Sequence, residues 1–233
     1  MRLIPPTLAA SILATAPHAI AQTPPAEDNR QLGPVVISEI MYNPASREGG
    51  YINEQTNQPV PTKTEWVEIY NPSDQPIDVS GWVLSDEDGA TGPLPDGTVL
   101  EPKGVLVINP IDCDAATFQA AWGECDVVGV EHWSWDGIEN LANSPSDWNE
   151  KLRLSDADGH LIDEVNFDDD PPWPGDSPHG PSIYLLPDGL SPDGNDDAIH
   201  WARSTEGTDG AIKAEITPVF NGDDFGSPGT VQD

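Results

Sequence analysis

Acidic side chains are the residues of this chain whose types and spacing could do chemistry. Glu65 and Glu68 share one extended stretch, Glu39 precedes them in another, and Asp168 and Asp169 come later in the chain. Carboxylates that lie close together repel one another unless a cation or a proton intervenes. Because calcium takes oxygen ligands of this kind, these five residues are candidate calcium ligands. The alternative is that calcium does not bind and the acidic residues form turns and a charged surface.

Two further acidic stretches have the composition of calcium loops. Asp156, Asp158 and Gly159 fall together, and residues 193–197 carry three aspartates and an asparagine. Neither stretch has the twelve-residue frame or the terminal glutamate of an EF-hand. Aspartate and glycine are also good turn formers, so we favour turns at both places, with calcium loops as the alternative.

Motifs that signal an enzyme are missing from the sequence. It contains no Gly-x-Ser-x-Gly elbow, no His-Glu-x-x-His pair and no glycine-rich phosphate loop. His179 lies near Ser182, but the spacing supplies no acid that would orient the histidine. We therefore predict a protein without enzymatic activity. A hydrolase with an acidic site is the alternative.

Tryptophans supply the sharper candidates for binding. Trp133, Trp135 and Trp148 lie in one polar stretch, and exposed aromatic faces stack on sugar rings or on partner proteins. These three residues are the predicted ligand-binding side chains. The alternative is that they pack a long loop onto the core.

The first 21 residues have the form of a secretory signal peptide. Arg2 is followed by a mildly apolar stretch, and Ala19-Ile20-Ala21 gives a small-x-small cleavage site before Gln22. Secretion or display at the cell surface or in the periplasm is therefore expected. In an oxidising compartment the two cysteines, Cys113 and Cys125, are expected to form a disulfide. Two unpaired buried thiols are the alternative.

The charge of the chain limits its partners. Nine lysines and arginines stand against 41 aspartates and glutamates, a net charge of −32. A surface this acidic repels phosphate backbones, so nucleic-acid binding is not expected. It also favours a monomer. No segment after the leader approaches eighteen apolar residues, so stable membrane insertion is not expected.

Short strands are the elements that would position these residues. Residues 65–82 predict a hairpin, because apolar and polar side chains alternate on both sides of a polar turn. Residues 151–154 and 161–167 predict a second hairpin around an Asp-Gly turn. Residues 115–122 predict the one convincing helix, between an N-cap aspartate and a glycine that ends it.

The order of these segments resembles the lamin tail domain. Ser38 to Pro44, the central stretch 65–82 and the Pro-Trp-Pro corner at 172–174 each have a counterpart in that family. The resemblance implies an all-β, immunoglobulin-like antiparallel β-sandwich of about nine short strands with one short helix near residues 115–122.

The chain is expected to have three parts. The leader pattern assigns residues 1–21 to the signal peptide, the polar composition assigns residues 22–33 to a flexible spacer, and the resemblance assigns residues 34–233 to a single sandwich domain. The departures from the family pattern are insertions at residues 45–64, 131–149 and 188–224.

Domains of this family on bacterial secreted proteins resemble attachment or interaction modules. The resemblance therefore implies a secreted module without enzymatic activity that binds an unknown protein or surface. The alternatives are a calcium-stabilised carbohydrate-binding module that uses the tryptophans and the acidic hydrolase named above.

Overall fold

A computed structural model gives the structure of the chain. It describes residues 33–46, 51–53, 55, 57–60, 64–133, 137–138, 141, 150–175 and 178–232. The chain divides into residues 1–30 and 31–233, and all the described residues belong to the second unit. In this described part, no helix combines the length and the apolar character that a membrane crossing requires.

A six-stranded sheet forms the centre of the second unit, in the order β13-β12-β1-β4-β8-β9. Its strands are β1 (Val36–Met41), β4 (Trp66–Tyr70), β8 (Val105–Pro110), β9 (Val127–Val130), β12 (Ile183–Leu185) and β13 (Trp201–Arg203). Neighbouring strands are antiparallel except β9, which runs parallel to β8 and so departs from the predicted antiparallel pattern. β4 is buried along its whole length, as a central strand covered on both faces should be.

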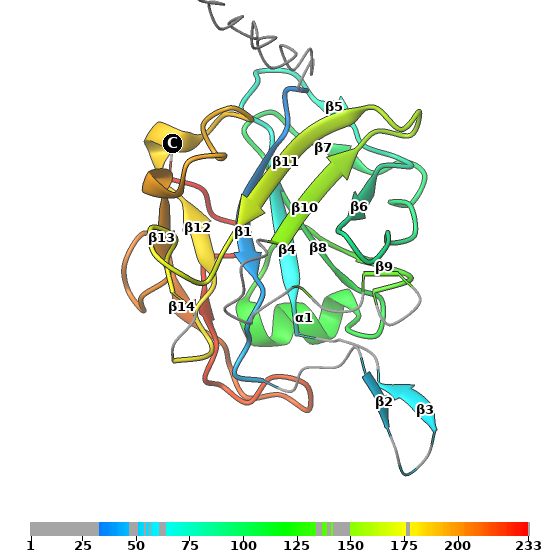
Figure 1. The fold of residues 1–233 in the computed structure, drawn as a ribbon, viewed down its shortest axis with the longest axis vertical. Coiled ribbons are helices and arrows are strands. Elements are labelled where there is room, and N and C mark those ends of the chain that lie inside the picture. Colours follow the sequence, from blue (N-terminus) through cyan, green and yellow to red (C-terminus); the bar gives the residue numbers. More distant parts are fainter. Residues whose placement is uncertain are drawn as a thin grey trace, which may run out of the picture. The chain divides into compact units, whose positions relative to one another are not determined.

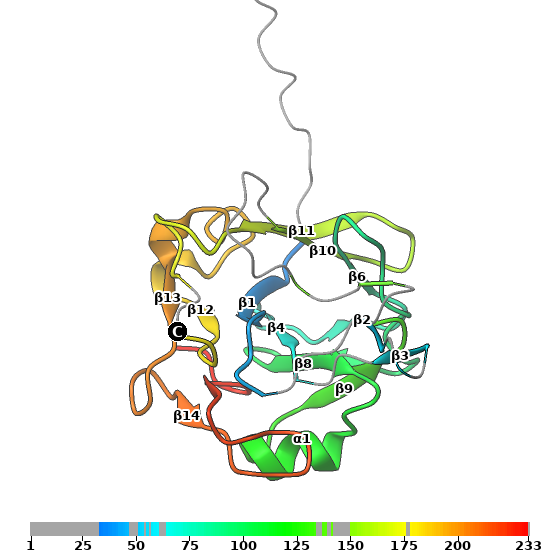
Figure 2. The same ribbon diagram turned by 60° about the horizontal axis from the view of Figure 1, so that its bottom comes forward.

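A three-stranded sheet in the order β11-β10-β6 makes the second layer. It consists of β6 (Val83–Ser85), β10 (Glu150–Ser155) and β11 (Leu161–Phe167). Figure 2 shows this sheet stacked over β1, β4 and β8. Side chains of both layers, such as Ile37 and Ile69 from one and Leu152 and Val165 from the other, form the main core. The predicted β-sandwich is confirmed.

Three pairs of short strands complete the described β structure. They are β2 (Tyr51–Asn53) with β3 (Gln58–Val60), β5 (Ile77–Asp78) with β7 (Val99–Leu100), and β14 (Ile212–Lys213) with β15 (Phe225–Gly226). Two 3₁₀ turns, η1 (Pro187–Gly189) and η2 (Ala198–His200), lie between β12 and β13. Phe225 of β15 forms an isolated bridge with Pro181, just before β12. Figure 1 shows β12 between β1 and β13.

The predicted helix and the later hairpin are confirmed. α1 spans Ala115–Trp122, and the Asp114 side chain accepts a hydrogen bond from the backbone N–H of Thr117 at 2.8 Å. β10 and β11 pair in antiparallel fashion, and Gly159 in their turn has φ 82°. A positive φ is what favours glycine at that position.

The predicted hairpin across residues 65–82 is wrong. β4 pairs with β1 and β8, whereas β5 pairs with β7 and β6 pairs with β10. Asn71 explains the local departure, because its side chain accepts from Ser73 N at 3.0 Å and donates to Leu100 O at 3.2 Å. These bonds tie the turn to the chain near β7, so it does not reverse onto β4. Alternation alone carries no information about which strand is the neighbour.

A second apolar cluster covers the other face of the six-stranded sheet. Trp66 and Met41 from the sheet pack there with Phe118 and Trp122 of α1 and with Phe220. The Trp66 and Trp122 rings meet edge to face, with centroids 5.7 Å apart. Figure 2 shows α1 on the side of the sheet opposite β10 and β11. This outer layer places α1 and the end of the chain against β1 and β4.

Candidate functional site

Glu39 on β1 and Glu68 on β4 face each other on the outer side of the six-stranded sheet. Ile37 pairs with Ile69 and Glu39 with Glu68, which leaves Ser38 as the extra residue of a β-bulge. Ile37 and Ile69 belong to the sandwich core. Because neighbouring residues of a strand point to opposite faces, Glu68 and its partner Glu39 point away from that core. Both glutamates are buried, with 1% and 0% of their surface exposed.

Donors from the end of the chain and from Ser182, just before β12, surround the Glu39 carboxyl group. Its Oε1 accepts from Ser227 N at 2.8 Å and from Ser182 Oγ at 2.5 Å, and its Oε2 accepts from Ser227 Oγ at 2.8 Å. Residues 225–230, which we call the C-terminal segment, thus bind directly to β1. Figure 2 shows the end of the chain, in red, on the α1 side of the sheet.

Glu68 is bound in the same way. Its Oε1 accepts from Ser38 Oγ at 2.8 Å, and its Oε2 accepts from Gly229 N at 2.7 Å. All four carboxyl oxygens of the pair therefore accept hydrogen bonds. A backbone N–H that points at a carboxylate oxygen occupies the position that a cation would need.

Burial raises the pKa of both glutamates. Desolvation raises the pKa of Glu39 to about 7, and hydrogen bonds from Ser182 and Ser227 offset only part of the effect. Desolvation, followed by the charge of Glu39, raises the pKa of Glu68 well above its ordinary value. The geometry favours a proton, with donors from the C-terminal segment, over a calcium ion between these two side chains.

Glu65, the third predicted ligand of this group, has a different role. Its Oε2 accepts from Trp133 Nε1 at 3.1 Å and from Leu141 N at 3.0 Å. The structure thus brings Glu39 and Glu68 together, while Glu65 binds the stretch after β9. Trp133 is 3% exposed and belongs to the main core. Its ring offers no open face to a ligand, so the alternative of loop packing describes this tryptophan.

The other two predicted binding tryptophans, Trp135 and Trp148, lie outside the described residues. The tryptophans that match family positions are all buried in one of the two clusters: Trp66, Trp82, Trp173 and Trp201.

Asp168 and Asp169 lie at the end of β11 with Asp170, and their carboxyl oxygens come within 4.8 Å of one another. Asp168 Oδ1 accepts from Asp170 N at 3.0 Å, which closes a local turn. These side chains are half-buried or exposed, and exposed acidic groups of this kind are common without an ion. They share no cluster with the three glutamates.

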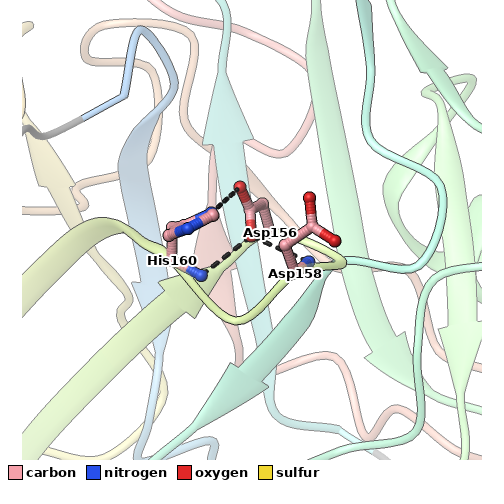
Figure 3. Close-up of side chains that lie close together, drawn as sticks. All are labelled: Asp156, Asp158 and His160. Carbon is pink, nitrogen blue, oxygen red and sulfur yellow. Dashed lines mark hydrogen bonds and ion pairs between the residues drawn. The ribbon is translucent and has the colours of Figure 1, made fainter.

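Asp156, Asp158 and His160 form the other acidic group in the described part of the chain. Figure 3 shows that the bonds in this group converge on Asp156. Its Oδ1 accepts from the backbone N–H groups of Asp158 and His160 at 2.9 and 2.8 Å, and Oδ2 lies 3.0 Å from His160 Nδ1. The hydrogen bond from the His160 backbone is the main cause that lowers the pKa of Asp156. Its carboxylate closes the β10–β11 turn, as the turn interpretation predicts.

The predicted disulfide is not formed, and Cys113 and Cys125 are thiols. Cys113 belongs to the outer cluster, and Cys125, which follows α1, packs against the same cluster and lines a hollow of about 610 Å³ together with Gly229. Burial raises the pKa of Cys125 to about 11, which makes it a poor nucleophile.

Sequence reasoning missed other buried acids that bind backbone groups. Asp163 Oδ2 accepts from Ile37 N at 2.6 Å and from Asn195 Nδ2 at 2.7 Å, and burial raises the pKa of Asp163 to about 7. Asp224 Oδ1 accepts from Ala45 N at 2.6 Å. The burial of Asp163 could have been predicted from the sequence, because Asp163 lies two residues before the buried Val165 and so faces the same side of β11. No local pattern marks Asp224.

A family model described as Lamin Tail Domain matches residues 29–169. The chain belongs to the lamin tail domain family. Its sandwich is therefore of the immunoglobulin-like type, as the resemblance implied. No curated protein matches the chain.

The match to the lamin tail domain ends at Asp169, within the acidic group after β11. β12 and β13, which belong to the six-stranded sheet, come after this point, as does the C-terminal segment that binds Glu39 and Glu68. The part of the chain that matches the family model contains Glu39 and Glu68. The part after Asp169 contains most of the hydrogen-bond donors to their carboxyl groups.

Proposed function

We propose that this lamin tail domain is an exported interaction module without enzymatic activity, which binds a protein partner. The observation that carries this proposal is a hollow of about 570 Å³ lined by two exposed isoleucines, Ile212 and Ile216. Large apolar side chains that gather in one exposed depression are typical of protein-binding surfaces. The leader-like first 21 residues support export, with cleavage between Ala21 and Gln22.

The use of the acidic residues supports a role without catalysis. Glu39, Glu68, Asp163 and Asp224 accept hydrogen bonds from backbone groups or serines that connect distant parts of the chain. A general acid or base must instead reach the proton of a substrate. These carboxyl groups are buried beneath the segments that they bind, so they serve the fold.

A photo-crosslinking experiment tests the binding role. Benzoyl-phenylalanine replaces Ile216 in the full chain, which is expressed and irradiated in its native cells. We expect a discrete protein adduct whose formation depends on light. The matched control carries the same residue at Ile199, which is similarly exposed, at 73% against 79%, and does not line the hollow. Equal adducts at both positions, or none at either, would overturn the proposal.

Two measurements address export and the other function classes. The N-terminus of the secreted protein should begin at Gln22. The purified mature chain should not hydrolyse ester, phosphodiester or glycoside substrates, and polysaccharides should leave its tryptophan fluorescence unchanged. Hydrolysis, or a saturable fluorescence change with a polysaccharide, would favour one of the alternative functions.

A further inference from the structure

β14 has a strand on one side only among the described residues, namely β15. Lys213 of β14 is the register partner of Phe225 of β15. Phe225 directs its backbone away from β14, since it donates to Gly180 O at 3.0 Å and accepts from Ser182 N at 2.9 Å. The two residues therefore form a non-hydrogen-bonded pair, and the backbone N–H and C=O of Lys213 point to the outer edge. On the same edge, Ala211 N donates to Thr208 O and Glu215 N donates to Ala121 O, so pairing with another strand would centre on Lys213.

The residues around this edge form the hollow of about 570 Å³. Ile212 is 43% exposed and Ile216 is 79% exposed, and Ala211 and Ala214 also line the depression. The other large hydrophobic residues that are exposed in the described structure, Val99, Ile111 and Ile199, do not line it. An apolar depression thus lies directly beside an outward-facing backbone donor and acceptor.

The charges at the edge favour a basic occupant. Glu206 and Glu215 line the same hollow. Lys213 is the cation there, but its Nζ lies 3.4 Å from Asp223 Oδ1 and 5.6 Å from the centroid of the Phe225 ring. The charge of Lys213 is therefore offset locally, and the two glutamates are left to attract positive side chains. The net charge of −32 adds long-range attraction for such a partner.

We propose that β14 pairs with an extended segment of another protein in which apolar and basic side chains alternate. The backbone of the segment would bond to Lys213, its apolar side chains would contact Ile212 and Ile216, and its basic side chains would approach Glu206 and Glu215. Addition of a strand to a sheet edge is a general mode of peptide recognition. A short edge strand that carries a lysine resists indiscriminate pairing, so the side-chain contacts supply the selectivity. This inference rests on the proposed function and specifies the chemistry of the partner.

The probe is a fluorescein-labelled hexapeptide of alternating lysine and valine, titrated with the mature chain at fixed ionic strength. Anisotropy should report saturable binding. Ile216→Asp should weaken binding by about tenfold or more, because it removes an apolar contact. Ile199→Asp, which adds the same charge at a similarly exposed position, should not. A glutamate–valine hexapeptide should bind at least about tenfold more weakly.

Backbone methylation separates strand pairing from simple charge attraction. A lysine–valine peptide that is N-methylated at every residue keeps its charge but has no backbone N–H to donate to the Lys213 carbonyl, so it should bind at least about tenfold more weakly. Equal affinity of the methylated peptide, equal losses in both isoleucine variants, or no saturable binding would overturn the edge proposal. A concentration-dependent dimer that Ile216→Asp abolishes would overturn it too, by assigning the edge to a second copy. In each of these cases an adduct at Ile216 in cells would leave the wider proposal of a protein-binding module standing.

Discussion

Glu39 and Glu68 are cross-strand partners on β1 and β4, and both accept hydrogen bonds from the same C-terminal segment. Two like-charged groups at such positions would normally destabilise a sheet. Here burial favours the protonated form, and the donors of the C-terminal segment bind the carboxyl oxygens. The stability of the folded protein and the binding of the C-terminal segment to β1 and β4 therefore both depend on this pair of glutamates.

Stability should decrease as pH rises through the weakly acidic range. The pKa of Glu39 is raised from 4.5 to about 7 in the folded protein, so its contribution is fully present below about pH 4.5 and is lost towards pH 7. The glutamine of Glu39→Gln stays neutral at every pH. This variant should therefore reduce the change in the free energy of unfolding between pH 4.5 and pH 7 by up to about 3 kcal/mol, measured by urea unfolding at several pH values. Glu101→Gln, at an exposed position, is the control. An unchanged slope in the Glu39 variant would contradict this account.

Ser227→Ala should lower the free energy of unfolding by about 1–3 kcal/mol. The substitution removes the hydroxyl that donates to Glu39 Oε2 at 2.8 Å and leaves a buried acceptor without that donor. Urea unfolding measures the effect. Thr205→Ala, which removes an exposed hydroxyl, should stay within about 0.5 kcal/mol of the parent protein. Equal effects of the two substitutions would show that the hydroxyl of Ser227 does not bind the glutamate.

Asp163→Ala should be strongly destabilising, by about 2–4 kcal/mol. The change leaves the Ile37 N–H and the Asn195 amide group without their shared acceptor inside the sandwich. Guanidinium unfolding followed by tryptophan fluorescence provides the measurement. Asp158→Ala, in the exposed β10–β11 turn, removes a charge of the same sign and should change stability little. A loss in Asp158→Ala as large as that in Asp163→Ala would point to net charge as the cause.

The cysteines should remain thiols in the purified protein. Denaturation without a reductant, followed by iodoacetamide, should add two alkyl groups to the intact mass. In the folded protein Cys125 should react slowly at neutral pH and faster towards its raised pKa of about 11. The Cys113→Ser variant has Cys125 as its one thiol, so any alkylation of this variant can be assigned to Cys125. A mass without added alkyl groups would establish the disulfide.

Calcium should leave the melting temperature unchanged relative to EDTA at matched ionic strength. The reason is that hydrogen-bond donors already approach each carboxyl oxygen of Glu39 and Glu68. Isothermal titration of the same protein supplies an independent measurement. Saturable heat that persists in Glu39→Gln and disappears in Asp168→Asn would instead place a calcium ion at the acidic group after β11.

Local chemistry is enough to predict several elements of this fold. α1 follows from an N-cap aspartate and a closing glycine, and the β10–β11 hairpin follows from an Asp-Gly turn between alternating strands. Each signal lies within a few residues of the backbone that it shapes. The family can also be identified from the sequence, because an ordered series of short motifs is specific even where each motif is weak.

Tertiary structure alone decided the strand pairings and the roles of the acids. Ser38 meets Glu68 across 30 positions, and Ser227 meets Glu39 across 188. No pattern within a single stretch of sequence encodes such distant partners. For this reason the predicted strand neighbour of β4 was wrong, and the two glutamates were interpreted as candidate calcium ligands. The sequence determined that the glutamates would need a partner, because like charges in a sheet repel. Only the packing of a distant chain end over β1 and β4 brought the hydrogen-bond donors of serine and glycine to these carboxyl groups.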